Sequence, residues 1–209
     1  MDFLRDSWSK FTEESAKAYL RTMGYPAHSS MILLMRILRN RFRAASEDKI
    51  LDVGCGNASV YSSMKRHGIP CEYVGVDFSG ALLRGAQSLH PEVMVSEMDV
   101  QCLALPDRSF DFVIFSHVFE ALSSPGQALQ ESKRVCRKKI LIRFCEPPVF
   151  QHDTAELWFM DVGMGPVPYL RRKMSKDFYD MLLANCGIKK VEFYKDNDSK
   201  DQIHVLSVD

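Results

Sequence analysis

The 209-residue sequence has no C-x-x-C pair, no net charge and no long apolar run, and each absence excludes a class of protein. Its six cysteines are scattered, a pattern that fits buried, reduced thiols better than zinc ligands or a disulfide framework. Twenty-seven basic residues balance 27 acidic ones, which disfavours a broad nucleic-acid-binding face. No apolar run approaches the roughly 18 residues that cross a membrane. We therefore expect no metal, nucleic-acid or membrane partner.

The remaining composition is that of a globular protein. Hydrophobic residues make up 46% and charged residues 26% of the chain. The first ten residues, "MDFLRDSWSK", lack the basic-then-apolar order of a secretory signal, so we expect a cytoplasmic protein. The length suits one domain of ordinary to large size, or a core with a small appendage. We expect a monomer or a homodimer.

Apolar, β-branched-rich runs alternate with stretches that have helical features. The runs predict buried parallel strands at residues 49–54, 72–77, 93–99, 110–117 and 139–146. Between them, Gly68 is typical of a helix end and Ser79 of a helix N-cap. This alternation predicts a doubly wound α/β sheet.

The two ends of the chain depart from the alternation. A helix capped by Ser175 and ended by Gly187 is expected next, and after it the runs 189–195 and 202–208 are separated by only six residues, "DNDSKD". That spacing is too short for a crossover helix, so it predicts an antiparallel hairpin. Before the sheet, residues 7–21 and 28–43 are typical of two helices.

The second N-terminal helix carries an apolar stripe at steps of three and four residues. Its members are Met31, Leu34, Met35, Leu38 and Phe42. Such a stripe indicates either core packing or a lid over a ligand. We expect residues 1–45 to form an N-terminal helical cap and residues 46–209 to form the main domain.

The stretch "KILDVGCGNAS" (49–59) begins like a dinucleotide-binding loop and then departs from one. Gly54 and Gly56 have G-x-G spacing, but Ser59 replaces the third glycine and Asp52 precedes the first. A carboxylate beside a pyrophosphate is unfavourable by about 1 kcal/mol or more. Beside an ammonium and a sulfonium it is attractive, so the loop favours S-adenosylmethionine over NAD.

Two further acids end the next two predicted strands. Asp77 follows Gly56 by 21 residues, which suits hydrogen bonds from both ribose hydroxyls of a nucleoside. Asp99 ends the third strand, where it can accept from an adenine amine. The alternative for both is a solvated carboxylate in a loop.

The chain resembles class I S-adenosylmethionine-dependent methyltransferases over residues 49–142. The segments "ILDVGCGNAS", "VGVDFS", "MDVQCLALPDRSFDFVIFSHVFEAL" and "ALQESKRVCRKKILI" are similar to the successive motifs of that family. The resemblance implies a Rossmann-like seven-stranded sheet with S-adenosylmethionine across the ends of its first four strands. Ala58 replaces a glycine common in the loop, and no Pro-Gly-Gly turn precedes the fifth strand.

The resemblance also implies a role for each matched position. Asp52 and the two loop glycines would line the methionine portion, Asp77 the ribose, and Asp99 with Val100 the adenine. Ser116 and His117 would face the reacting end. The full set of implied cofactor contacts is Asp52, Gly54, Cys55, Gly56, Asp77, Phe78, Asp99, Val100 and Ser116.

Methyl transfer requires alignment and exclusion of water, and a general base helps only when the acceptor is an alcohol, phenol or ammonium. His117, which follows the fourth predicted strand, and Tyr169 are the candidate catalytic residues. The alternative for His117 is packing against adenine or a bond to the backbone.

Residues 146–174 are least like the shared fold, and their aromatic and proline content predicts an apolar wall around the substrate. His152, Trp158 and Arg171 are the candidate substrate contacts, with a solvated charge run as the alternative for Arg171. Residues 116–119 read Ser-His-Val-Phe and lack the Asn/Asp-Pro-Pro-aromatic pattern common in methyltransferases that act on exocyclic or glutamine amines. We therefore expect a small-molecule acceptor.

Three other functions fit parts of the pattern. A closed pocket could cyclise S-adenosylmethionine and release methylthioadenosine. A regulatory subunit could keep the fold without turnover. An NAD-dependent reductase agrees least with Asp52 and Ser59.

Overall fold

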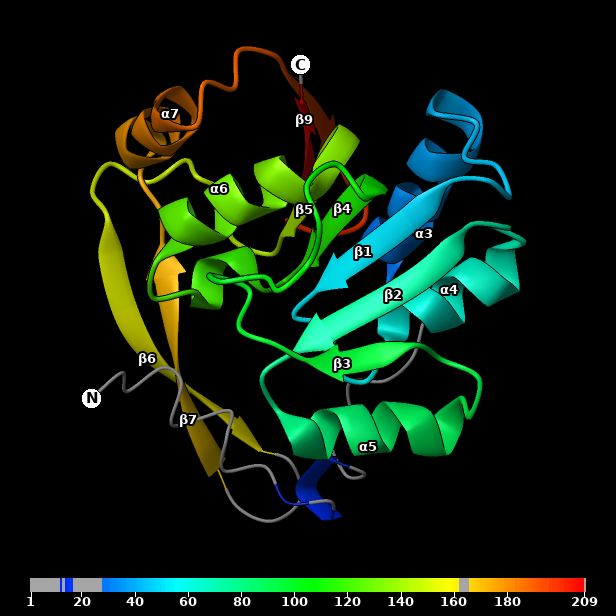
Figure 1. The fold of residues 1–209 in the computed structure, drawn as a ribbon. Coiled ribbons are helices and arrows are strands. Elements are labelled where there is room, and N and C mark those ends of the chain that lie inside the picture. The colour runs from blue at the N-terminus through cyan, green and yellow to red at the C-terminus, as the bar shows by residue number, and fades with distance from the viewer. Residues whose placement is uncertain (1–11, 13, 17–27, 162–165, 209) are drawn as a thin grey trace.

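In a computed structural model of the chain, residues 12, 14–16, 28–161 and 166–208 are described (Figure 1). They form a seven-stranded sheet in the order β3-β2-β1-β4-β5-β9-β8. Its strands are β1 (Lys49–Val53), β2 (Glu72–Asp77), β3 (Val95–Glu97), β4 (Phe110–Ser116), β5 (Cys136–Phe144), β8 (Val191–Lys195) and β9 (Gln202–Ser207). The first five are parallel, whereas β9 runs antiparallel to β5 and β8. The predicted sheet and terminal hairpin are confirmed.

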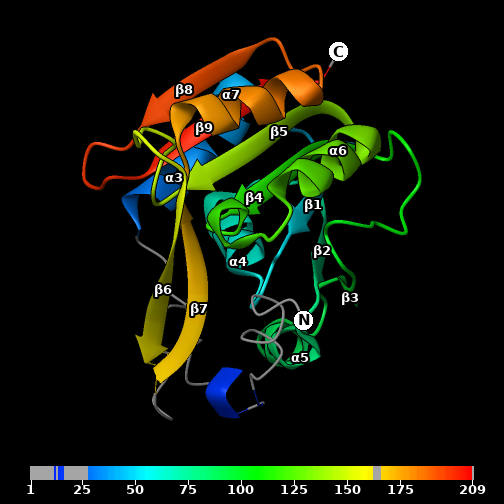
Figure 2. The same ribbon diagram turned by 90° about the vertical axis from the view of Figure 1, so that its left-hand side faces the viewer.

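Helices cover both faces of the sheet (Figures 1 and 2). One face carries α3 (Ser29–Arg36), α4 (Ser59–His67) and α5 (Gly80–Leu89), and the other carries α6 (Pro125–Val135) and α7 (Lys176–Asn185). The predicted caps are confirmed: Ser79 and Ser175 accept from the third backbone N–H of α5 and α7, and Gly68 ends α4 at φ 62°.

The apolar stripe of α3 packs into the core. The buried side chains of Met31, Leu34, Met35 and Leu38 belong to the same core cluster as the strand residues Ile50, Phe112, Ile114 and Leu141. The helix continues into a wider turn, η1 (Ile37–Arg41), after which Phe42 packs on the same cluster. Core packing is therefore the correct interpretation of this stripe.

Of the helix predicted at 7–21, residues 14–16 are helical and most of the rest lies outside the described residues. The boundary at residues 45/46 stays a prediction.

Strand β5 contains a bulge that decides which way its side chains point. It begins directly after α6, and its pairing with β4 steps from Phe110↔Cys136 to Phe112↔Lys139, so β5 has one extra residue there. Beyond the bulge, Ile142 faces α6 and α7, whereas Arg143 faces α3.

Strands β6 (Thr154–Asp161) and β7 (Pro166–Lys173) form a separate two-stranded hairpin. The sequence predicted only an apolar wall in this segment, and the hairpin itself was not predicted. Proline is uncommon in strands, so Pro166 and Pro168 did not indicate one. Both lie on β7, which has an unpaired edge because the sheet has two strands, and such an edge tolerates proline. The hairpin lies on the side toward which β1 and β2 point, and β7 contacts η2 (Phe119–Ala121), the turn after β4 (Figures 1 and 2). In the described part of the chain, no helix has the length and apolar character needed to cross a membrane.

Because Leu34 is fully buried, we expect Leu34→Ala to lower the free energy of unfolding by about 2–5 kcal/mol. Arg36→Ala, on the exposed side of the same helix, is the control and should change it by about 0.5 kcal/mol or less. Urea unfolding of both variants measures the difference. A loss below about 1 kcal/mol for Leu34→Ala would mean that α3 is not part of the cooperative core.

Candidate functional site

The loop after β1 has a left-handed backbone at Gly54 (φ 70°), Gly56 (φ 50°) and Ala58 (φ 59°). The backbone N–H groups of Gly54 and Cys55 both donate to the carbonyl of Val76, at 2.8 and 3.0 Å. A Cβ on Gly54 would lie 2.6 Å from Val118 Cγ1, whereas one on Gly56 would meet no atom closer than 4.0 Å. Gly54 thus permits close packing, and Gly56 leaves its backbone open to a ligand.

Asp77 fastens this loop to the end of β2. Its Oδ2 accepts from the Gly56 N–H at 2.9 Å, and its Oδ1 accepts from the Ser79 N–H at 2.8 Å. Burial raises the pKa of the carboxyl although these bonds favour its ionised form. Each oxygen retains a second lone pair, so Asp77 can still accept a bond from a ligand hydroxyl.

Asp52 is a buried acid whose two carboxylate oxygens differ in their hydrogen bonding. Only 1% of the residue is exposed, and its Oδ2 accepts from the Tyr73 hydroxyl at 2.7 Å. Its Oδ1 has no hydrogen-bond partner among the described residues. Burial, opposed by the Tyr73 bond and reinforced by the charge of Asp77, raises the Asp52 pKa to about 7. A nearby cation would stabilise its ionised form.

Other predicted cofactor residues lie around the same strand ends. Cys55 is buried against Gly75, and burial raises the pKa of its thiol. Phe78 is half-buried just after β2. Asp99 lies two residues beyond the end of β3, where its Oδ1 accepts from the backbone N–H of Gln101 at 2.9 Å, and Val100 is buried next to it.

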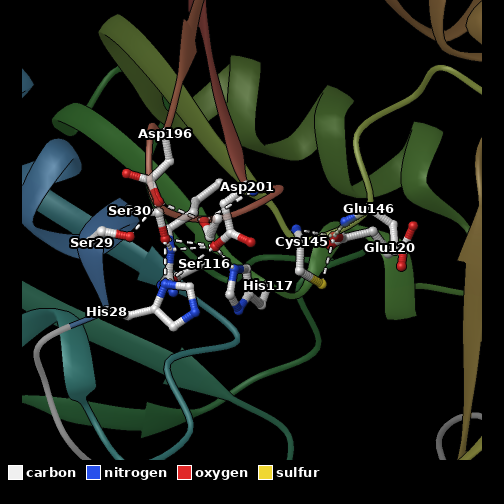
Figure 3. A network of polar contacts seen from close by, with 12 residues as sticks. His28, Ser29, Ser30, Ser116, His117, Glu120, Cys145, Glu146, Asp196 and Asp201 are labelled. Carbon is white, nitrogen blue, oxygen red and sulfur yellow. Dashed lines mark hydrogen bonds and ion pairs between the residues drawn. The ribbon is translucent and has the colours of Figure 1, made fainter.

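His117 lies directly after β4 and has an unusual backbone, with φ 58°. Its Nε2 is 2.7 Å from Asp201 Oδ2, in the loop between β8 and β9 (Figure 3). The same Asp201 oxygen accepts from the Ser30 hydroxyl at 2.6 Å and lies 3.6 Å from Arg143 Nε. No local sequence motif marks Asp201, Ser30 or Arg143, so their place in this network was not predicted.

Arg143 ties the other predicted residue of this strand end into the network. Its Nη1 donates to the Ser116 hydroxyl at 2.6 Å and its Nε to the Ser30 hydroxyl at 2.9 Å. His28 Nδ1 is 2.9 Å from the same Ser30 oxygen, and its ring lies edge-on to the His117 ring, with centroids 6.0 Å apart. The network thus joins β4, β5, the start of α3 and the β8–β9 loop.

A second cluster attaches the hairpin beside His117. Glu120 Oε1, in η2, accepts from the backbone N–H of Cys145 at 2.8 Å. Arg171, in β7, donates to the Cys145 sulfur, lies 3.9 Å from Glu146 Oε1 and stacks on Trp158 at 4.4 Å. Only 13% of the Arg171 side chain is exposed, so this residue is not a solvated charge.

The two remaining predicted residues differ in their surroundings. Tyr169 is half-buried on β7, where burial raises the pKa of its phenol and the neighbouring Arg171 opposes that shift. His152 is exposed in the segment before β6, and among the described residues none forms a hydrogen bond, ion pair or ring contact with it. Within the described ranges, no group of three or more His, Cys, Asp or Glu side chains could hold a metal ion.

Comparison with known proteins finds methyltransferases. A family described as "Methyltransferase domain" matches residues 51–142. The malonyl-[acyl-carrier protein] O-methyltransferase of Paenibacillus sp. is 22% identical over 175 residues, covering 78% of this chain and 63% of that protein. The demethylmenaquinone methyltransferase of Thermotoga maritima is 27% identical over 134 residues, covering 63% of this chain and 58% of that protein.

The fold is also that of solved methyltransferases. The S-adenosylmethionine-bound structure of CalS10, an amino pentose methyltransferase from Micromonospora echinaspora, superposes with a TM-score of 0.65. It is 16% identical, and the match covers 92% of this chain and 95% of that one, so it shows a shared fold. The chain spans 63% and 58% of the two curated relatives described above.

The two loop glycines should respond differently to a methyl group. Both substitutions carry the cost of a left-handed alanine, about 1–2 kcal/mol, but only Gly54→Ala also collides with Val118. We expect Gly54→Ala to lower the free energy of unfolding by about 1–3 kcal/mol more than Gly56→Ala, measured in urea. Repeating the pair in a Val118→Ala background should shrink this difference. Equal losses in both backgrounds would contradict the packing argument.

Proposed function

The chain belongs to the class I S-adenosylmethionine-dependent methyltransferase family, and we propose that it transfers the methyl group of S-adenosylmethionine to a small-molecule acceptor. The observation that carries this proposal is the buried carboxylate of Asp52 beside the glycine loop, whose Oδ1 has no hydrogen-bond partner among the described residues. A cationic ligand would balance its charge, and a pyrophosphate would not.

The residues present fit this cofactor at three points. Gly56 leaves its backbone accessible, with space where a side chain would otherwise stand. The Asp77 carboxylate, fixed by two backbone bonds, retains lone pairs for ribose hydroxyls. Asp99 and Val100, after β3, are proposed to hold the adenine. When bound, S-adenosylmethionine supplies a methyl group on a positively charged sulfur.

The chain's own residues would then position the acceptor and exclude water. We propose that the hairpin face with Trp158, Tyr169 and Arg171 borders the acceptor, because Arg171 contacts Cys145 and Glu146 just after β5 and stacks on Trp158. Strand β7 as a whole also contacts η2. In this proposal Arg171 acts mainly by orienting the hairpin. Among the described residues, His152 has no contact that supports a similar role. The relatives are named as malonyl-[acyl-carrier protein], demethylmenaquinone and amino pentose methyltransferases. Because these acceptors differ from one another, we propose a small molecule and no particular compound.

No contact among the described residues favours cyclisation of S-adenosylmethionine over methyl transfer. The named relatives given above are all methyltransferases, which favours transfer. Chromatography of the nucleoside product separates the two reactions, because methyl transfer yields S-adenosylhomocysteine and cyclisation yields methylthioadenosine. A regulatory subunit would yield neither product.

We expect isothermal titration calorimetry to show S-adenosylmethionine binding that weakens at least ~30-fold in Asp77→Ala, through loss of charge-assisted hydrogen bonds. Asp198→Ala, at an exposed position, is the matched control and should bind like the unaltered protein. Because Asp77 also fixes the loop, thermal unfolding of each free variant should be recorded. Unchanged affinity in a folded Asp77→Ala variant would refute the site assignment.

Asp52 should make both stability and binding depend on pH. Its pKa is about 7 in the folded chain and about 3.9 when unfolded. Its contribution to stability is therefore complete below pH ~3.9 and lost as the pH rises through 7. We expect Asp52→Asn to be more stable than the unaltered free protein at pH 8, by about 1 kcal/mol or more.

Ligand binding should show the opposite trend. Because a cation favours the ionised Asp52, affinity for S-adenosylmethionine should rise between pH 6 and pH 8, by up to about tenfold. Asp52→Asn should bind more weakly and lose this pH dependence. Calorimetry at both pH values measures the trend, and an identical pH dependence in the two proteins would rule out Asp52 as its source.

A further inference from the structure

His117 is held in a strained position beside the glycine loop. Its φ of 58° is uncommon for a residue with a side chain, and strain of this kind concentrates at functional sites. Its backbone N–H donates to the carbonyl of Arg143 at 3.0 Å, which anchors it to β5. The next residue, Val118, packs on the backbone of Gly54. The His117 backbone is therefore anchored to β5, and the next residue in the chain contacts the proposed cofactor loop.

We propose that His117 and Asp201 form a proton-accepting dyad, in which Asp201 positions the imidazole and His117 removes a proton from the acceptor. This inference rests on the proposed function and narrows it. The acceptor would be an alcohol, a phenol or an ammonium, because these groups must lose a proton when they are methylated.

The first support is the geometry of the imidazole. Its Nε2 is bonded to Asp201 at 2.7 Å, so the ionised carboxylate fixes the tautomer with the hydrogen on Nε2. Burial favours the neutral carboxyl, but the hydrogen bonds from His117 and Ser30 and the charge of Arg143 outweigh it and hold the Asp201 pKa at about 2. Nδ1 keeps its lone pair and has no hydrogen-bond partner among the described residues. About 30% of the side chain is exposed, which leaves it accessible.

The second support is the charge around the ring. Asp201 and Glu120 favour the imidazolium, whereas Arg143 opposes it, and His28 meets the ring edge-on. Burial is the largest effect and lowers the His117 pKa below its usual value. The ring is therefore neutral at pH 7 and able to accept a proton. Asp201 stabilises the imidazolium that then forms.

The third support is that Asp201 does not need His117 to satisfy its charge. The Ser30 hydroxyl bonds to it at 2.6 Å, and the buried Arg143 guanidinium lies 3.6 Å away. A purely structural Asp201 would be stable with these two partners. Its bond to His117 orients a ring that follows β4 directly and is next in sequence to Val118, which packs on Gly54.

Atoms and electrons balance in the proposed proton and methyl transfer. The acceptor proton passes to His117 Nδ1, and the freed oxygen or nitrogen lone pair forms a bond to the methyl carbon. The carbon–sulfur bond breaks with its electron pair going to sulfur, which leaves S-adenosylhomocysteine. The imidazolium then releases its proton to solvent through its exposed edge.

Nitrogen-15 NMR of the His117 ring tests the dyad without any acceptor. We expect the Nε2–H tautomer at pH 8, and a His117 pKa that falls in Asp201→Asn because the carboxylate no longer supports the imidazolium. Ser30→Ala, which removes a different partner of Asp201 and leaves the His117 bond, is the control and should retain the tautomer. An Nδ1–H tautomer in the unaltered protein, or an identical titration in Asp201→Asn, would overturn the proposal.

Turnover of paired probe acceptors tests the acceptor class. The probes are catechol, 2-phenylethanol and benzylamine, which carry a proton to lose, and N,N-dimethylbenzylamine and thioanisole, which do not. We expect S-adenosylhomocysteine to form only with the first group, and His117→Gln and Asp201→Asn to slow it about 100-fold or more with unchanged S-adenosylmethionine affinity.

The outcomes separate the two proposals. Turnover with the first group that both variants leave unchanged, or turnover confined to the second group, would overturn the dyad while supporting methyl transfer. Absence of S-adenosylmethionine binding in calorimetry would instead refute the proposed function. The ring spectra remain a direct test of the dyad in either case.

Discussion

The contact between Gly54 and Val118 is the constraint on which the site depends. Strands β1 and β4 are parallel neighbours that end together, with Val53 opposite Phe115, so the segments that follow them must diverge or pack. The absence of a side chain at Gly54 lets them pack. This one contact brings the glycine loop and His117 to the same place. The bonds to Val76 and Asp77 then fix the loop from the β2 side.

The polar groups at this edge of the sheet form two networks with different electrostatics. In the first, Asp52 and Asp77 are buried acids held by hydrogen bonds from Tyr73 and backbone N–H groups, and burial raises the pKa of both. In the second, Asp201 lies close to Arg143, and its pKa is low. The first arrangement suits a cationic ligand. In the second, Arg143 balances the charge of Asp201, which suits a carboxylate that orients a histidine.

The sequence predicted features whose signals are local. Strand runs, the caps at Ser79 and Ser175, and the glycines of the loop are each recognisable within a few residues, and the structure contains them. Asp201 was not predictable, because it meets His117 and Ser30 across 84 and 171 residues of chain. The β6–β7 hairpin was missed since prolines interrupt its pattern. The roles of the site residues remain predictions.

The bulge in β5 has a consequence for tolerated changes in chain length. Side chains alternate along a strand, so one extra residue between Cys136 and Lys139 determines which sheet face every later residue occupies. Deleting that residue would rotate Arg143 away from α3 and into the apolar layer beneath α6 and α7. Asp201 would lose its cation, and a guanidinium would enter a layer of hydrocarbon. The number of residues at this junction is therefore constrained as strongly as their identity.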